Sequence, residues 1–241
     1  MTWEATPKDL QKANATAHTN YSMEGPGVGA DGQAFDLCDK ISPIVPGQRV
    51  VEVGYGHGFL MQRAAEEGCY CTGIDIGPAC SHGKGITALK ENNLEAFDRV
   101  QLFCADSSHE AMPLPDDSQD HAFCTETIEH LSNPYFMCCE IKRVLKHGGT
   151  FTMAFPDCLD NLGYDGGQHA HVYPNWLTEA NFELFAKQLY FKVMHKYQNG
   201  STLWWVLKNY KRDGIVDVFR MTSGNYTEAS LFDCLEEWDG T

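Results

Sequence analysis

Short apolar runs alternate along this chain with longer segments whose apolar residues recur every three or four positions. The short runs predict β-strands and the longer segments predict amphipathic α-helices. Strands are expected just before a glycine turn at residue 54 and at residues 69–76, 99–105, 121–125, 150–156, 190–197 and 202–209, and helices at 7–18, 33–41, 59–67, 80–97, 134–146 and 176–189. This alternation predicts an α/β domain, and Asn199-Gly200 between the last two strands predicts a hairpin.

The same pattern divides the chain into three regions. We expect an N-terminal helical cap or lid segment at residues 1–47, a single nucleotide-binding domain at 48–209 and an acidic C-terminal extension at 210–241. A glycine-rich loop at 21–29 precedes the first strand of the domain. A loop in that place either closes over a ligand or is a plain surface loop.

Charge and composition restrict the partners. The 241 residues carry a formal net charge of −15, which disfavours a nucleic-acid partner because phosphates would be repelled over most of the surface. We find neither a signal-peptide pattern nor an apolar run that would span a bilayer, so the expectation is a soluble, cytoplasmic protein without a membrane role. The oligomeric state is left open.

The ten cysteines do not have the spacing of a disulfide scaffold or a zinc site, and no C-x-x-C motif occurs. We expect reduced thiols that mostly behave as small buried hydrophobes. Thiol chemistry on arsenic or another soft acceptor is the alternative.

Glycines recur at every second position where the first strand ends. Gly54, Gly56 and Gly58 follow Glu52, and this spacing predicts a tight turn whose main chain a ligand can approach closely. A dinucleotide fingerprint, G-x-G-x-x-G, would require a third glycine where Phe59 stands. The acid on the strand favours a ligand that carries a cation.

Acidic residues also mark the ends of the next two strands. Asp75 lies about twenty residues after the first glycine, where an acid accepts the hydroxyls of an adenosine ribose. Asp106-Ser107 ends the third strand. A helix N-cap or turn aspartate is the competing interpretation of Asp106.

Two segments carry a family resemblance. The E-x-G-x-G-x-G pattern from Glu52 and the E-x-x-E-H-L pattern from Glu126 to Leu131 resemble motifs of class I S-adenosylmethionine-dependent methyltransferases of the small-molecule type. The resemblance implies a Rossmann-like seven-stranded sheet, mostly parallel with an antiparallel C-terminal hairpin and helices on both faces. The loop after the fourth strand is not Asn/Asp-Pro-Pro-Tyr/Phe, which argues against enzymes that methylate amines of DNA bases.

The resemblance also implies a cofactor site. Glu52 and the backbone of the glycine turn would hold the methionine end of S-adenosylmethionine, Asp75 its ribose, and Asp106 with Ser107 its adenine. The product would be S-adenosylhomocysteine. The complete set of expected cofactor-binding residues is Glu52, Gly54, Tyr55, Gly56, Gly58, Asp75, Ile76, Asp106, Ser107, Thr125 and Glu126.

The acceptor is expected to be a small molecule methylated on oxygen, nitrogen or sulfur. His130 is the first candidate for a general base, followed by His169 and His171 in the long loop at 157–175. No full ligand set accompanies the H-x-H pair, so no metal is predicted. Two alternatives stay open, namely an NAD(P)-dependent oxidoreductase on a related sheet and a non-catalytic S-adenosylmethionine-binding partner protein.

Overall fold

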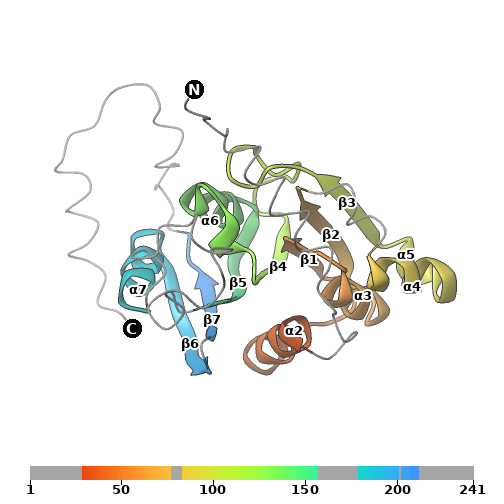
Figure 1. Ribbon diagram of the computed structural model, residues 1–241, viewed down its shortest axis with the longest axis horizontal. Helices are drawn as coiled ribbons and strands as arrows, with labels where there is room; N and C mark the ends of the chain where they lie inside the picture. Colours follow the sequence, from red (N-terminus) through yellow and green to blue (C-terminus); the bar gives the residue numbers. More distant parts are fainter. Residues whose placement is uncertain (1–28, 77–82, 157–178, 201, 212–241) are drawn as a thin grey trace, which may run out of the picture. The chain divides into compact units, whose positions relative to one another are not determined.

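The computed structural model describes residues 29–76, 83–156, 179–200 and 202–211, and its sheet has seven strands (Figure 1). All of these residues except Lys211 belong to the compact unit Met1–Tyr210. The strands are β1 (Arg49–Val53), β2 (Tyr70–Asp75), β3 (Val100–Cys104), β4 (Gln119–Thr125), β5 (Leu145–Pro156), β6 (Phe191–Asn199) and β7 (Thr202–Asn209). Their spatial order is β3-β2-β1-β4-β5-β7-β6.

The pairing of the strands confirms the predicted fold class. Strands β1 to β5 pair in parallel, whereas β7 is antiparallel to both β5 and β6. The predicted hairpin is therefore present, with its second strand lying between the first and the parallel sheet. Strand order reverses between β1 and β4, so the carboxyl ends of these two strands form the crevice in which open α/β sheets bind ligands.

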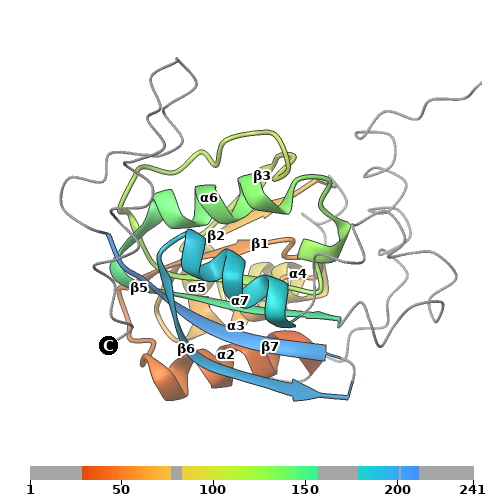
Figure 2. The ribbon, with the colours of Figure 1, turned by 90° about the vertical axis from the view of Figure 1, so that its left-hand side faces the viewer.

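Helices cover both faces of the sheet. Figure 2 shows α6 on one side of the strands and α2 on the other. The helices are α2 (Gly29–Ile41), α3 (Phe59–Glu66), α4 (Lys84–Asn92), α5 (Leu94–Phe97), the 3₁₀ turn η2 (Ile128–His130), α6 (Pro134–Val144) and α7 (Glu179–Gln188). Each face has its own hydrophobic core, as expected for a central parallel sheet whose strands are buried on both sides.

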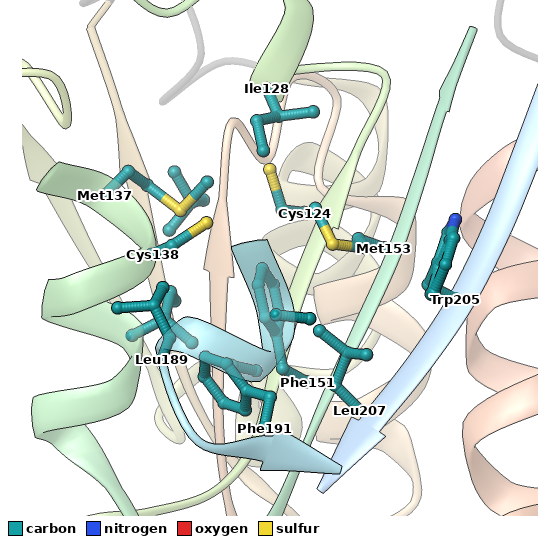
Figure 3. Packing of buried hydrophobic residues seen from close by; sticks show 14 of the residues in the cluster. Cys124, Ile128, Met137, Cys138, Phe151, Met153, Leu189, Phe191, Trp205 and Leu207 are labelled. Atoms are coloured by element: carbon teal, nitrogen blue, oxygen red, sulfur yellow. The ribbon is translucent and has the colours of Figure 1, made fainter. Parts of the chain in front are cut away.

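The core beneath α6 and α7 supports the end of β4. Figure 3 shows Cys124, Ile128 and Met153 close together, with Met137 and Cys138 of α6 beside them. All five are at most 1% exposed. Because close-packed interiors resist displacement, this packing holds the β4–η2 segment in place on the sheet.

The second core attaches α2 to the parallel strands. Phe35 of α2 stacks on Phe123 of β4 with ring centroids 6.4 Å apart, and the Arg63 guanidinium of α3 lies 4.2 Å from the centroid of Phe35. Burial of aromatic surface and the cation–π contact both favour this arrangement. Helix α2 is therefore part of the packed unit and brings its first turn to β4.

Two boundaries differ from the sequence prediction. The helix expected at 134–146 ends at Val144, and the strand expected at 150–156 begins earlier, because β5 starts at Leu145. Tertiary contacts explain the change, because the N–H groups of Asp117 and Ser118 donate to the carbonyls of Arg143 and Val144. Because these carbonyls bond to the segment before β4, the chain leaves the helix at Val144 and enters β5 at Leu145.

The helix expected at 80–97 is also divided. The structure describes α4 and α5 with a break at Asn93, whose side-chain oxygen accepts a hydrogen bond from the Ala96 N–H at 3.1 Å. Asparagine caps a helix N-terminus in this way, so it starts a new short helix instead of continuing the old one. The expected helix at 7–18, most of the loop at 21–29 and the acceptor loop at 157–175 lie outside the described residues.

The described cysteines are all free thiols, as predicted. Cys38, Cys69, Cys71, Cys124 and Cys138 are buried, Cys139 is half-buried and Cys104 is exposed on the edge strand β3. Among the described residues, no helix combines the length and apolar character that crossing a bilayer requires.

Candidate functional site

The predicted glycine turn joins β1 to α3. Gly54 and Gly56 have φ angles of +75° and +48°, in the left-handed region that L side chains rarely adopt. A Cβ on Gly54 would overlap the Thr127 side chain, whereas a Cβ on Gly56 would have no atom within 4 Å. The turn therefore packs tightly against the segment after β4 and leaves open space over Gly56.

Asp75 closes the other side of the turn. Its Oδ2 accepts a hydrogen bond from the Gly56 N–H at 3.2 Å, so the end of β2 is attached to the turn after β1. Ile76 follows half-buried, and its carbonyl accepts from the Cys104 thiol at 3.3 Å. Tyr55 is 3% exposed and packs beside Gly73, so its ring belongs to the core and only its backbone faces the turn.

Asp106 caps the turn that follows β3. Its carboxylate accepts hydrogen bonds from the Ser108 N–H at 2.9 Å and lies 3.0 Å from His109 Nδ1. The Asp106 N–H donates to Glu110, and Ser107 is buried. The structure thus confirms that Asp106 caps a turn. The residue follows β3, which pairs with β2, the strand that ends at Asp75.

Glu52 is the most unusual member of the site. The residue is 1% exposed, and neither carboxylate oxygen has a hydrogen-bond partner. Burial raises the pKa of this carboxyl well above its usual range, Asp31 and Asp75 raise it further, and the nearby Met61 backbone partly offsets the shift. A buried carboxyl without donors costs free energy, so this position fits a ligand that supplies them.

The residues after β4 form the opposite wall. Thr125 and Glu129 are buried, and Glu126 is exposed with a φ of +46°. Burial raises the pKa of the Glu129 carboxyl well above its usual range, and the neighbouring Glu126 raises it further. Loss of hydration also raises the pKa of the Glu126 carboxyl, and its hydrogen bond with Glu129 partly offsets that shift. Left-handed backbone at a non-glycine residue is sparsely populated and concentrates at functional sites.

His130 lies at the end of η2 beside this acid pair. Its side chain is 12% exposed, and its Nε2 lies 3.8 Å from Glu129 Oε1. His130 therefore lies in the segment after β4, next to Glu129. His169 and His171, the other two candidate bases, lie outside the described residues.

One site residue has no counterpart in the sequence prediction. Asp31, in the first turn of α2, is 5% exposed, and its Oδ1 accepts a hydrogen bond from Thr125 Oγ1 at 2.8 Å. An acid in the first turn of a helix is common because it interacts well with the helix dipole. Its sequence position therefore carried no signal, and only the packing of α2 reveals it.

Five carboxyls gather at the crevice. We call them the acid cluster, and its members are Asp31, Glu52, Asp75, Glu126 and Glu129. Within the described ranges, Asp31, Glu52 and Glu126 have no ion pair with lysine or arginine. Such a site attracts cations and repels phosphates. The described residues also contain no group of three or more potential metal ligands.

These residues fit S-adenosylmethionine. Its α-ammonium and sulfonium are cations, and Glu52, whose oxygens are unsatisfied, lies two residues before the glycine turn. The turn has open space at Gly56. Asp75 and Asp106 end adjacent strands on the same edge, as binding of a nucleoside requires. A dinucleotide would instead place its pyrophosphate at this turn, against the acid cluster.

Comparison with known proteins finds methyltransferases. Residues 51–153 match the family described as a methyltransferase domain. A ubiquinone biosynthesis O-methyltransferase of Xanthomonas campestris pv. campestris (strain B100) is 30% identical over 148 residues, 61% of this chain and 59% of that protein. A demethylmenaquinone methyltransferase of Tropheryma whipplei (strain Twist) is 28% identical over 110 residues, 46% of this chain and 42% of that protein. The chain spans about half the length of these relatives.

Solved structures share the fold. The geranyl diphosphate C-methyltransferase of Streptomyces coelicolor A3(2), in complex with Mg²⁺, geranyl diphosphate and S-adenosyl-L-homocysteine, superposes with a TM-score of 0.66 at 13% identity, covering 86% of this chain and 100% of that one. The seven-stranded sheet of this chain is thus shared with a methyltransferase whose structure contains S-adenosyl-L-homocysteine. The match to the methyltransferase domain family covers residues 51–153 of the 241 in the chain.

Proposed function

We propose that this protein transfers a methyl group from S-adenosylmethionine to a small-molecule acceptor. The observation that carries the proposal is the buried Glu52 carboxylate, which has no hydrogen-bond partner and lies in the acid cluster at the crevice between β1 and β4. A cationic donor satisfies this carboxylate, whereas a pyrophosphate would be repelled. The related O-methyltransferase and menaquinone-type enzymes support a small acceptor.

The chain's own residues would mainly bind and orient the reactants. When bound, S-adenosylmethionine supplies an electrophilic methyl group on a sulfonium. Glu52 and the backbone of Gly54 to Gly58 would hold its methionine end, Asp75 its ribose, and Asp106 with Ser107 its adenine. Correct positioning of two reactants contributes roughly 7–11 kcal/mol to lowering a barrier, so no covalent machinery is required.

The acceptor side has one described candidate base. We assign to His130 the removal of the proton that an oxygen, nitrogen or sulfur acceptor loses on methylation. The neighbouring Glu129 is buried, and burial raises the pKa of its carboxyl, which disfavours a negative charge beside the imidazole. His169 and His171 are further candidates from the sequence. The proposal also retains the expected cytoplasmic location.

Ligand binding and product formation test this function separately. Calorimetry should show micromolar binding of S-adenosylhomocysteine and no binding of NADH, and the reverse preference would establish the oxidoreductase alternative. A donor carrying a radiolabelled methyl group, incubated with the protein and a small-metabolite extract, should yield a labelled small product. Binding of the cofactor without any labelled product over a panel of quinols, phenols, amines and thiols would favour the non-catalytic alternative.

A further inference from the structure

Asp31 is a buried acid that a helix from outside the matched residues 51–153 brings to the site. Thr125 Oγ1 donates to its Oδ1 at 2.8 Å, which joins the first turn of α2 to the end of β4. Phe35, one turn further along α2, stacks on Phe123 of the same strand. The position of the Asp31 carboxylate is therefore fixed by packing and by a hydrogen bond.

The strand register places this carboxylate near Glu52. Glu52 of β1 pairs with Phe123 of β4, and Thr125, the hydrogen-bond partner of Asp31, lies two residues further along β4. Asp31 raises the pKa of both Glu52 and Glu126, which lie on opposite sides of the crevice. Burial raises the pKa of Asp31 itself, and the Thr125 hydrogen bond and His57 of the glycine turn partly offset that shift. Asp31 thus lies between the turn after β1 and the end of β4.

A purely structural role does not account for this arrangement. A buried aspartate next to a buried glutamate destabilises the folded protein unless a cation or several donors lie between them. Asp31 has the Thr125 hydroxyl, but Glu52 is 1% exposed and both of its oxygens lack a partner. The Glu52 carboxylate therefore points to a ligand with several N–H donors.

We propose that Asp31 and Glu52 form a carboxylate pair that binds the α-ammonium of the cofactor's methionine half. The proposal rests on the function proposed above and adds a binding residue from the N-terminal helix. An ammonium has three donors and a full charge, which two carboxylates satisfy better than one. Thr125 positions Asp31 for this contact.

The substitution Asp31→Asn separates charge from shape. Asparagine keeps an acceptor oxygen for Thr125 but removes the negative charge. Calorimetry would compare three ligands, namely S-adenosylhomocysteine, 5′-methylthioadenosine, which lacks the amino-acid part, and an S-adenosylhomocysteine analogue lacking only the α-amino group. We expect D31N to weaken binding of the first by about tenfold or more, because hydrogen bonds to charged groups are lost. Binding of the other two should not weaken.

Asp36→Asn is the matched control. It makes the same chemical change on the same helix, at an exposed carboxylate that pairs with Arg63 on the surface. All three affinities should match those of the wild type. Thermal unfolding of each variant would show that it is folded.

Specific results would overturn the assignment. Unchanged S-adenosylhomocysteine affinity in D31N, or an equal loss for all three ligands, would assign Asp31 to the fold and not to the ammonium. If D31N does not fold, the same three affinities would be measured on Asp31→Ser. If neither variant folds while D36N does, Asp31 has a structural role and the assignment fails. A wild-type protein that binds none of the three ligands would instead contradict the proposed function.

Discussion

Gly54 and Thr127 occupy adjoining space, because a Cβ on residue 54 would overlap the Thr127 side chain. Thr127 Oγ1 also lies 2.9 Å from the Thr125 carbonyl and 3.4 Å from the Gly54 carbonyl. The turn after β1 and the segment after β4 are therefore one packed assembly. Two residues that are 73 positions apart in sequence therefore contact each other where β1 and β4 end.

Gly54→Ala should damage both the fold and the site. The left-handed backbone costs an alanine about 1–3 kcal/mol, and the overlap with Thr127 adds to that cost. We expect a lower melting temperature and a large loss of S-adenosylhomocysteine affinity. Gly47→Ala is the control, since it has a φ of +87° but no neighbour within 4 Å. Equal effects of the two changes on affinity would contradict the packing argument.

Gly56→Ala should affect ligand binding more than stability. The added methyl group would enter open space over the turn, where the cofactor's main-chain contacts are expected. Gly200→Ala, in the hairpin between β6 and β7, has a similar φ of +60° and equally open surroundings, so it measures the backbone strain alone. Both variants should lose similar stability, while only Gly56→Ala loses S-adenosylhomocysteine affinity. Wild-type affinity in Gly56→Ala would exclude close approach of the ligand at this position.

His121 makes stability depend on pH. Burial lowers the pKa of this histidine from 6.5 to about 4, and its ring contacts Thr150 at 2.6 Å and Gln48 at 3.0 Å. Between those pH values the unfolded chain binds a proton that the folded protein does not bind. The free energy of unfolding therefore falls as the pH drops from about 6.5 to about 4, by up to about 3 kcal/mol.

His121→Gln removes this term, and urea titrations of both proteins across that pH range would measure it. The raised pKa values of Glu52 and Glu129 act in the opposite sense, because those carboxyls bind protons more readily when folded. The difference between wild type and variant isolates the histidine. We expect the difference in unfolding free energy to shrink toward acid pH, and parallel pH curves would show that His121 does not contribute.

His130→Ala should lower turnover by about tenfold or more once the acceptor is known, because general bases contribute at least that much. Cofactor affinity should change little, since the expected cofactor contacts come from other residues. His195→Ala, at an exposed position of β6, is the control and should leave both quantities unchanged. Unchanged turnover in His130→Ala would remove this residue from the role of base.

Local patterns in the sequence were sufficient for much of this protein. Periodicity and the Asn199-Gly200 pair predicted the alternating elements and the hairpin, because those signals act over a few residues. The E-x-G-x-G-x-G and E-x-x-E-H-L patterns pointed to the crevice through a family resemblance. The ends of helices and strands were less well predicted where residues distant in sequence decide them. The Val144 carbonyl at the end of α6, for example, accepts a hydrogen bond from the Ser118 N–H just before β4.

Only the tertiary structure decided which acids share the site. Asp31 and Thr125 are 94 positions apart, and no spacing rule relates them. Their contact depends on α2 packing against β4 through Phe35 and Phe123, a long-range burial of apolar surface that leaves no local pattern. The unsatisfied state of Glu52 likewise exists only once the surrounding strands have excluded water. Sequence determined the class of fold and indicated the proposed donor through a resemblance, and packing determined which carboxyls meet at the proposed site.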